Sequence, residues 1–169
     1  INIIPTSDII IEGNKTVALT LLSGAYIIGA PNNALVTITD DDILGNFRTK
    51  MKITFSGYNK PQTLLNFPAL VIFSESLNFF RYSDFYSPDG GDLRFMNSNE
   101  TVYLNYEIEG WNPAGASFVW VQVPELVDSN SYIWAYWRSP SETNPPPCTT
   151  NGSTWDSRFS GVWHFPSAG

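Results

Sequence analysis

Apolar and polar residues alternate along most of this chain with a period of two, which is the pattern of strands that bury one face. The alternation is clear over residues 16–22, 34–39, 51–55 and 102–109, and shorter apolar runs at 70–73, 92–96, 118–123 and 132–137 predict further strands. Over 102–109 the two sides are Val102, Leu104, Tyr106 and Ile108 against Tyr103, Asn105, Glu107 and Glu109. We expect the first side to lie in a core.

Turn residues separate these strands, for example Pro88-Asp-Gly-Gly and Asp128-Ser-Asn-Ser. The one helix-like stretch, residues 74–85, is aromatic and Ser-rich with little amphipathic order, so we expect a long loop there with room for one turn. Many short strands at this spacing predict an all-β protein. The expected architecture is an antiparallel, jelly-roll-like β-sandwich with a partial second sandwich at the N-terminus.

The composition changes after Trp137, where Pro, Ser and Thr dominate. Three consecutive prolines, Pro145, Pro146 and Pro147, supply no backbone donors to a sheet, so this segment is expected to be an extended strap or linker. We therefore divide the chain into a terminal part of one module at 1–42, a central sandwich at 43–138, the strap or linker at 139–158 and the start of another module at 159–169.

Several phrases of the central module are distinctive: Asn66-Phe-Pro-Ala-Leu-Val-Ile, Gly91-Asp-Leu-Arg-Phe, Leu104-Asn-Tyr-Glu-Ile-Glu, Val119-Trp-Val-Gln-Val-Pro and Trp155-Asp-Ser-Arg-Phe-Ser-Gly-Val-Trp-His. With them, residues of about 51–158 resemble the domain-of-unknown-function family 2341. That resemblance implies that a concanavalin A-like, laminin G-type sandwich follows, with residues 159–169 as its opening strand.

The segments Ile9-Ile-Ile-Glu-Gly-Asn, Ala25-Tyr-Ile-Ile-Gly-Ala-Pro and Val36-Thr-Ile-Thr-Asp-Asp-Asp resemble the last strands of a Calx-beta repeat, an extracellular sandwich module. The first strands of that module are absent, so one apolar face would stay uncovered. Our hypothesis is that strands of a neighbouring chain or of upstream sequence cover this face, whose residues are Val17, Leu19, Val36 and Ile38.

The Calx-beta resemblance implies calcium as the candidate cofactor, since hard cations take several oxygen ligands. The acidic residues at the implied positions are Asp8, Glu12, Asp40, Asp41 and Asp42. Ser7 and Lys15 stand where calcium-binding members have carboxylates, so the set is incomplete. The alternative is a solvated acidic turn between modules.

Charge and composition exclude several partners. The net charge of −7, with nine Lys and Arg that do not cluster, leaves no basic patch for nucleic acid or anionic membrane, and no apolar run is long enough to insert into a bilayer. Cys148 is the only cysteine and cannot form an internal disulfide. Glycosylation triplets begin at Asn14, Asn99 and Asn151. An extracellular or cell-surface location is inferred from the module type alone.

Aromatic residues, which make up 15% of the chain, supply a second candidate site. Sugars stack on exposed rings, and the candidate glycan-binding residues are Trp111, Tyr132, Trp134, Tyr136 and Trp137. Alternation puts Tyr132, Trp134 and Tyr136 on one face of their strand, so at least one tryptophan points away from a single core. Trp111, in a turn, is the ring expected to be most exposed. The alternative is that both faces are buried and these rings are core residues.

The sequence offers only weak candidates for a catalytic site. Glu107 and Glu109 share one side of a strand, and Asp89 and Asp92 lie in a Gly-rich turn, but carboxylates on a solvated face explain them as well. The single histidine, His164, is interpreted as a packing or capping residue, and no nucleophile triad or phosphate loop is present in the sequence.

The sequence therefore predicts a non-catalytic structural or adhesive segment of a large extracellular modular protein. Its expected partners are copies of itself or neighbouring modules, which could build a filament through strand exchange. The alternatives are a carbohydrate-binding module and an accessory domain of a glycan-active enzyme. A groove with an exposed tryptophan would favour glycan binding, whereas open edges that meet copies of the chain would favour assembly.

Overall fold

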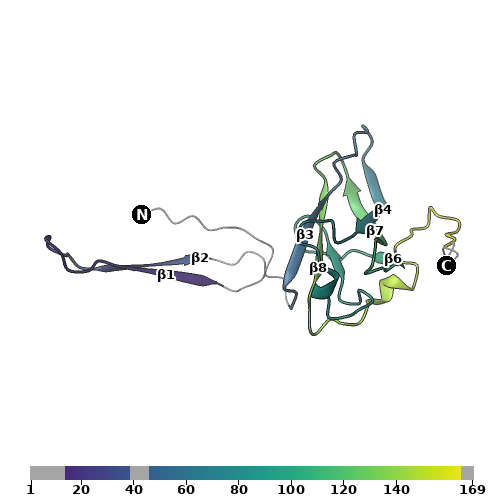
Figure 1. The fold of residues 1–169 in the computed structure, drawn as a ribbon. Helices are drawn as coiled ribbons and strands as arrows, with labels where there is room; N and C mark the ends of the chain where they lie inside the picture. The colour runs from purple at the N-terminus through teal and green to yellow at the C-terminus, as the bar shows by residue number, and fades with distance from the viewer. Residues whose placement is uncertain (1–13, 39–45, 165–169) are drawn as a thin grey trace.

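The computed structural model describes residues 14–38 and 46–164, and these residues form strands, turns and two short 3₁₀ helices. The strands pair into three antiparallel sheets, which confirms the all-β prediction (Figure 1). The strands are β1 (Lys15–Thr20), β2 (Asn33–Ile38), β3 (Thr49–Thr54), β4 (Leu64–Phe73), β5 (Arg94–Met96), β6 (Tyr106–Gly110), β7 (Ser117–Leu126) and β8 (Tyr132–Trp137). The 3₁₀ helices are η1 (Tyr82–Asp84) and η2 (Pro147–Thr149). No helix in these described ranges is long and apolar enough to cross a membrane.

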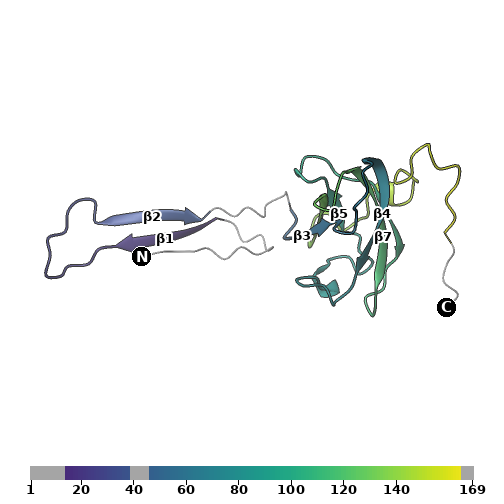
Figure 2. The ribbon, with the colours of Figure 1, turned by 90° about the horizontal axis from the view of Figure 1, so that it is seen from above.

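Two of the sheets pack face to face as the predicted sandwich (Figure 2). One sheet has the order β3-β8-β5 and the other has the order β4-β7-β6. Strands distant in sequence are joined in each: Thr49 pairs with Trp137, and Phe73 pairs with Ser117. Each sheet thus has one face in the core and one outer face.

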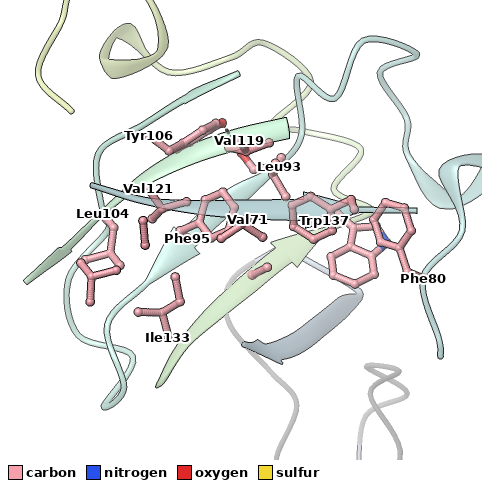
Figure 3. Close-up of a cluster of buried hydrophobic side chains, with 14 of the residues drawn as sticks. Val71, Phe80, Leu93, Phe95, Leu104, Tyr106, Val119, Val121, Ile133 and Trp137 are labelled. Atoms are coloured by element: carbon pink, nitrogen blue, oxygen red, sulfur yellow. Dashed lines mark hydrogen bonds between the residues drawn. The ribbon is translucent and has the colours of Figure 1, made fainter. Parts of the chain in front are cut away.

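Alternation along the central strands fills the core between the sheets (Figure 3). β8 contributes Ile133, Ala135 and Trp137, each at most 1% exposed, and β7 contributes Val119 and Val121 from the opposite sheet. The two faces of β8 are therefore divided as the sequence predicts. A β-sheet buries residues in this way because successive side chains point to opposite sides.

The segment 74–85 is a loop with the short helix η1 at its end, in agreement with the expectation of a long loop. Its Phe80 is fully buried and closes one end of the core. The ring of Phe80 stacks on Phe73 with centroids 5.0 Å apart and meets Trp137 edge-on at 5.5 Å. The loop is thus an integral part of the core.

The strand expected over 102–109 begins later than predicted, at Tyr106. Leu104 and Tyr106 are buried as expected, but Val102 is 54% exposed, so its predicted core position is wrong. The physical reason is a turn: the Asn97 side chain accepts hydrogen bonds from the backbone N–H groups of Thr101 and Val102. The chain leaves this turn beside β5 before it joins the other sheet.

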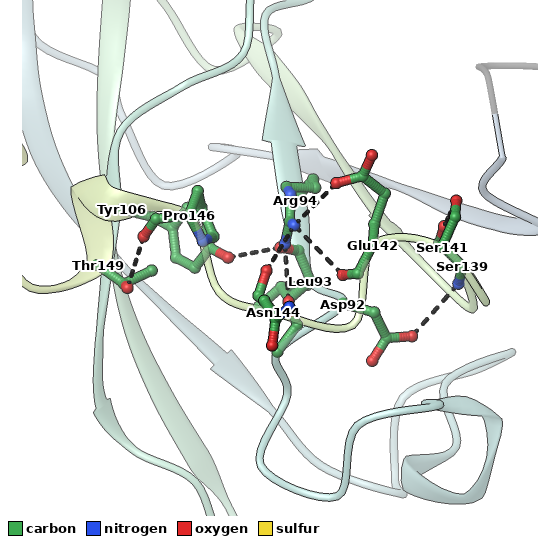
Figure 4. A network of polar contacts seen from close by, with 11 residues as sticks. Asp92, Leu93, Arg94, Tyr106, Ser139, Ser141, Glu142, Asn144, Pro146 and Thr149 are labelled. Atoms are coloured by element: carbon green, nitrogen blue, oxygen red, sulfur yellow. Dashed lines mark hydrogen bonds and ion pairs between the residues drawn. The ribbon is translucent and has the colours of Figure 1, made fainter.

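The strap is fastened by Arg94, whose guanidinium is largely buried (Figure 4). One terminal nitrogen donates to the carbonyl oxygens of Gly91 and Leu93 at 2.8 and 2.7 Å. The other donates to the Asn144 carbonyl at 2.8 Å and to the carbonyl and carboxylate of Glu142, each at 3.2 Å. A planar guanidinium with five N–H donors can bind several closely spaced acceptors of this kind at once.

The N-terminal sheet is a hairpin in which β1 and β2 pair only with each other among the described strands. Val17 lies opposite Val36, and Leu19 lies opposite Ala34, so these apolar side chains share one face. That face is not covered within the described chain: Val36 is 45% exposed, and Val17 and Leu19 are only partly buried. The hypothesis that other strands cover this face is therefore compatible with the structure and stays a prediction.

Candidate functional site

The outer face of the β3-β8-β5 sheet carries Tyr132, Trp134 and Tyr136, which we call the aromatic row of β8. Tyr132 and Trp134 are partly exposed, with ring centroids 6.0 Å apart. The Nζ atom of Lys52 lies 3.7 Å from the centre of the Tyr132 ring, and that of Lys50 lies 4.7 Å from the centre of a Trp134 ring. Trp134 thus points away from the core, as alternation predicts, but lysine ammonium groups already occupy the ring faces.

The other three candidate glycan-binding residues, Trp111, Tyr136 and Trp137, are covered to different degrees. Trp137 is fully buried in the core, and Tyr136 is fully buried beneath Phe47, at a centroid distance of 5.9 Å. Trp111 was expected to be the most exposed ring, but it is half-buried. Figure 3 shows the core into which Trp137 points. A ring without an accessible face cannot contact a sugar, so Tyr136 and Trp137 are excluded, and Tyr132, Trp134 and the half-buried Trp111 remain as candidates from this set.

Trp111 is half-buried because a loop folds over it. Its indole meets the rings of Tyr82 and Phe85 edge-on at 5.3 and 5.0 Å. Gly90, at φ +78°, lies so close that a Cβ there would come within 3.0 Å of the indole. Only glycine combines that backbone conformation with that approach. The position of Trp111 in a turn therefore did not make it exposed.

The candidate calcium ligands Asp8, Glu12, Asp40, Asp41 and Asp42 lie outside the described residues. Across residues 14–38 and 46–164, no group of three or more His, Cys, Asp or Glu side chains could hold a metal ion. Calcium binding stays a prediction.

The turn carboxylates have structural partners. Asp92 is fully buried and accepts hydrogen bonds from the backbone N–H groups of Tyr86, Ser87, Arg138 and Ser139, at 3.0–3.3 Å. Asp89, on the surface of the same turn, accepts hydrogen bonds from the Ser87 hydroxyl and the Gly91 N–H. The Ser87 bond holds the pKa of Asp89 below its usual value. Asp92 therefore ties two loops together and has no access to a substrate.

Glu107 and Glu109 project from the outer face of β6 and bind the C-terminal part of the chain. Glu107 accepts a hydrogen bond from the indole nitrogen of Trp155 at 2.8 Å, and its other oxygen lies 3.0 Å from Nε2 of His164. Nδ1 of His164 contacts Glu109. The Glu109 bond, helped by both negative charges, raises the pKa of His164 above its usual value. The histidine thus forms a clamp between the two carboxylates.

The segment 153–164 lies across the outer face of the β4-β7-β6 sheet through further contacts. The Trp155 ring packs against Trp120 of β7 with centroids 5.5 Å apart. Side-chain amides of the sheet also hold its backbone: Asn105 donates to the Ser153 carbonyl at 3.0 Å, and Gln122 donates to the Thr154 carbonyl at 3.2 Å. The outer face of this sheet is thus partly covered by its own chain.

A groove of about 330 Å³ lies between this segment and the sheet, and we call it the indole groove. Its volume falls at the low end of the roughly 300–1,000 Å³ typical of small-molecule sites. Its lining residues are Leu70, Glu109, Phe118, Trp120, Trp155, Val162, Trp163 and His164. Trp163 is 75% exposed, whereas Leu70 and Phe118 are 42% and 40% exposed. The groove is apolar along its length and carries its charges at Glu109 and His164.

This groove could not be predicted from the sequence because its residues come from β4, β6, β7 and the segment 153–164. Alternation over 118–123 does place Trp120 on the outer side, so that signal was available. The positions of Trp155 and Trp163 had no such signal, since the docking of a segment without strand or helix pattern leaves no local period.

Residues 89–156 match the family described as Domain of unknown function (DUF2341), which confirms the resemblance over that part of the chain. No curated protein and no solved structure matches this chain.

Proposed function

Because residues 89–156 match a family without a known function, we propose a role from the surfaces of the chain: a non-catalytic structural or adhesive segment of an extracellular modular protein. The observation that carries this proposal is the hairpin β1–β2, whose apolar face is left partly exposed by the described residues. A two-stranded hairpin is marginally stable alone in water, and no further strand among the described residues pairs with either of its edges. Strands added from a neighbouring copy or module would stabilise the hairpin and pair with the backbone groups at its edges.

The positions of the carboxylates also favour a structural role. Asp92 is saturated by four backbone donors, while Glu107 and Glu109 hold Trp155 and His164. Each of these acidic groups therefore stabilises a contact between distant parts of the chain. A glycoside hydrolase would need a pair of carboxylates that faces a substrate.

Sedimentation velocity over a range of protein concentrations tests self-assembly. The wild-type chain should associate as its concentration rises, and Val36→Lys should abolish this because it places a charge on the apolar face of the hairpin. Thr37→Lys is the matched control, because Thr37 pairs with Thr16 on the opposite face. A wild-type chain that stays monomeric throughout, or equal effects of both substitutions, would contradict self-assembly through this face.

Carbohydrate binding is the second candidate function. The observation that favours it is a groove with an exposed tryptophan, Trp163, on the sandwich. Partly exposed Tyr132 and Trp134 on the other sheet provide a competing location. Binding of a neutral oligosaccharide by the intact chain, followed by NMR, tests this function.

A further inference from the structure

We infer that the indole groove binds a short neutral saccharide, with Trp163 and Trp120 as stacking rings and Glu109 as a hydroxyl acceptor. This inference rests on carbohydrate binding, the second candidate function, and places it on the outer face of β4-β7-β6. The aromatic row of β8 is the other location that the chain offers.

The shape of the groove suits one apolar face of a sugar ring. Three indoles and Phe118 line it, and the electron-rich faces of such rings attract the C–H bonds of a pyranose. Trp155 packs against Trp120 at an interplanar angle of 57°, so these two rings form a bent wall. Trp163, at 75% exposure, leaves most of its indole surface accessible to a ligand.

A glycine lies directly beside the exposed ring. The indole of Trp163 folds back over Gly161, where a Cβ atom would lie 2.5 Å from the ring. Any larger residue at 161 would push the indole away, so this close approach requires glycine. Gly161 therefore leaves room for the Trp163 indole at the rim of the groove.

The charged end of the groove can accept hydrogen bonds from hydroxyl groups. Each carboxylate offers about four lone-pair sites, and His164 uses only some of those on Glu107 and Glu109. Neighbouring hydroxyls of a sugar could therefore donate to Glu109. Because its raised pKa keeps His164 charged to a higher pH, one of the two carboxylate charges is balanced, which weakens the attraction of this end of the groove for a cationic ligand.

The absence of covering cations distinguishes this groove from the β8 row. Lys52 sits 3.7 Å above the Tyr132 ring, so a sugar there would have to displace an ammonium group from its favourable position. The residues that line the indole groove include no lysine or arginine. Stacking on Trp120 and Trp163 therefore requires no such displacement.

Saturation-transfer NMR on the intact chain tests the inference, with cellotriose, maltotriose, xylotriose and N-acetylchitotriose as neutral probes and choline as a cationic one. We expect at least one trisaccharide to bind, and Trp163→Ala to weaken that binding about tenfold, the loss of one stacking contact. Trp134→Ala and Phe79→Ala are the controls, because Trp134 lies on the other sheet and Phe79 is a similarly exposed ring elsewhere.

Each remaining outcome overturns the inference in a distinguishable way. Sugar binding that is lost in Trp134→Ala but kept in Trp163→Ala would preserve carbohydrate binding and move it to the β8 row. Binding of choline alone would assign the groove to cationic ligands. Failure of every trisaccharide to bind the folded wild-type chain would remove both the inference and the second candidate function.

Discussion

Replacing Asp92 by Asn should destabilise the sandwich far more than the same change at the neighbouring Asp89. Oδ2 of Asp92 accepts hydrogen bonds from the N–H groups of Tyr86, Arg138 and Ser139, and Oδ1 accepts one from Ser87. The asparagine would keep its oxygen toward the three donors, so its amide nitrogen would face the N–H of Ser87. One buried donor would then lose its acceptor, and three charge-assisted bonds would become neutral.

These changes set the size of the effect. A stranded buried donor costs about 1–3 kcal/mol, and each conversion from a charged to a neutral acceptor costs about 1 kcal/mol. Because such terms do not add fully, we expect Asp92→Asn to lower the free energy of unfolding by about 3–5 kcal/mol. That is a large share of the roughly 5–15 kcal/mol by which a domain is stable.

Urea denaturation followed by tryptophan fluorescence measures this difference. Asp89→Asn is the control, since Asp89 is exposed in the same turn and an asparagine oxygen can keep its bond from the Gly91 N–H; its effect should stay within about 0.5 kcal/mol. Faster hydrogen exchange at Ser87 and Ser139 in the Asp92 variant would locate the damage. A loss under about 1 kcal/mol, or equal losses in the two variants, would refute the argument.

Raising the pH should weaken the contact of His164 with Glu107 and Glu109 and loosen the end of the segment 153–164. The bond to Glu109 raises the pKa of His164, so the stabilising charge is fully present below its usual value of about 6.5 and is lost as the pH rises through the raised value. The indole N–H resonance of Trp155 should shift over that interval in the wild type and stay constant in His164→Asn; identical pH profiles would contradict the clamp. Arg94→Lys should destabilise the chain by about 2–4 kcal/mol, because one ammonium cannot reach all the carbonyls that the guanidinium binds. Hydrogen exchange should then increase over residues 139–150, and unchanged protection there would show that Arg94 does not hold the strap.

The alternation of apolar and polar residues predicted which side of each strand faces the core. It correctly divided β8 into Ile133, Ala135 and Trp137 on one side and the aromatic row on the other, since the side-chain period of a strand is fixed by the backbone. It gave no pairing between strands, because register across a sheet depends on partners that are distant in sequence. The pairing of β3 with β8 is an example, as about 80 residues separate them.

The predicted exposure of two residues in loops, Val102 and Trp111, is wrong. Val102 continues an apolar period but is exposed, because the Asn97 turn takes hold of the backbone just before the strand begins. Trp111 lies in a turn but is half-buried, because the loop that contains Phe85 and Gly90 folds over it. In both cases side-chain contacts across several residues decide the exposure, and the period of the chain does not record them.

The outer faces of the sheets show why function is harder to predict than fold here. Alternation states only that Glu107, Glu109 and Trp120 point away from the core, and a solvated face was the simplest interpretation. What covers that face is decided by Trp155 and His164, which lie about 50 residues further along and have no strand or helix pattern of their own. Whether a carboxylate on an outer face binds another part of the chain or stays in water therefore depends on one aromatic or basic residue that is distant in sequence. In this chain the candidate site is formed where the segment 153–164 lies on the β4-β7-β6 sheet. Substitutions in the sheet alone or in the segment alone should therefore perturb both the His164 clamp and the indole groove.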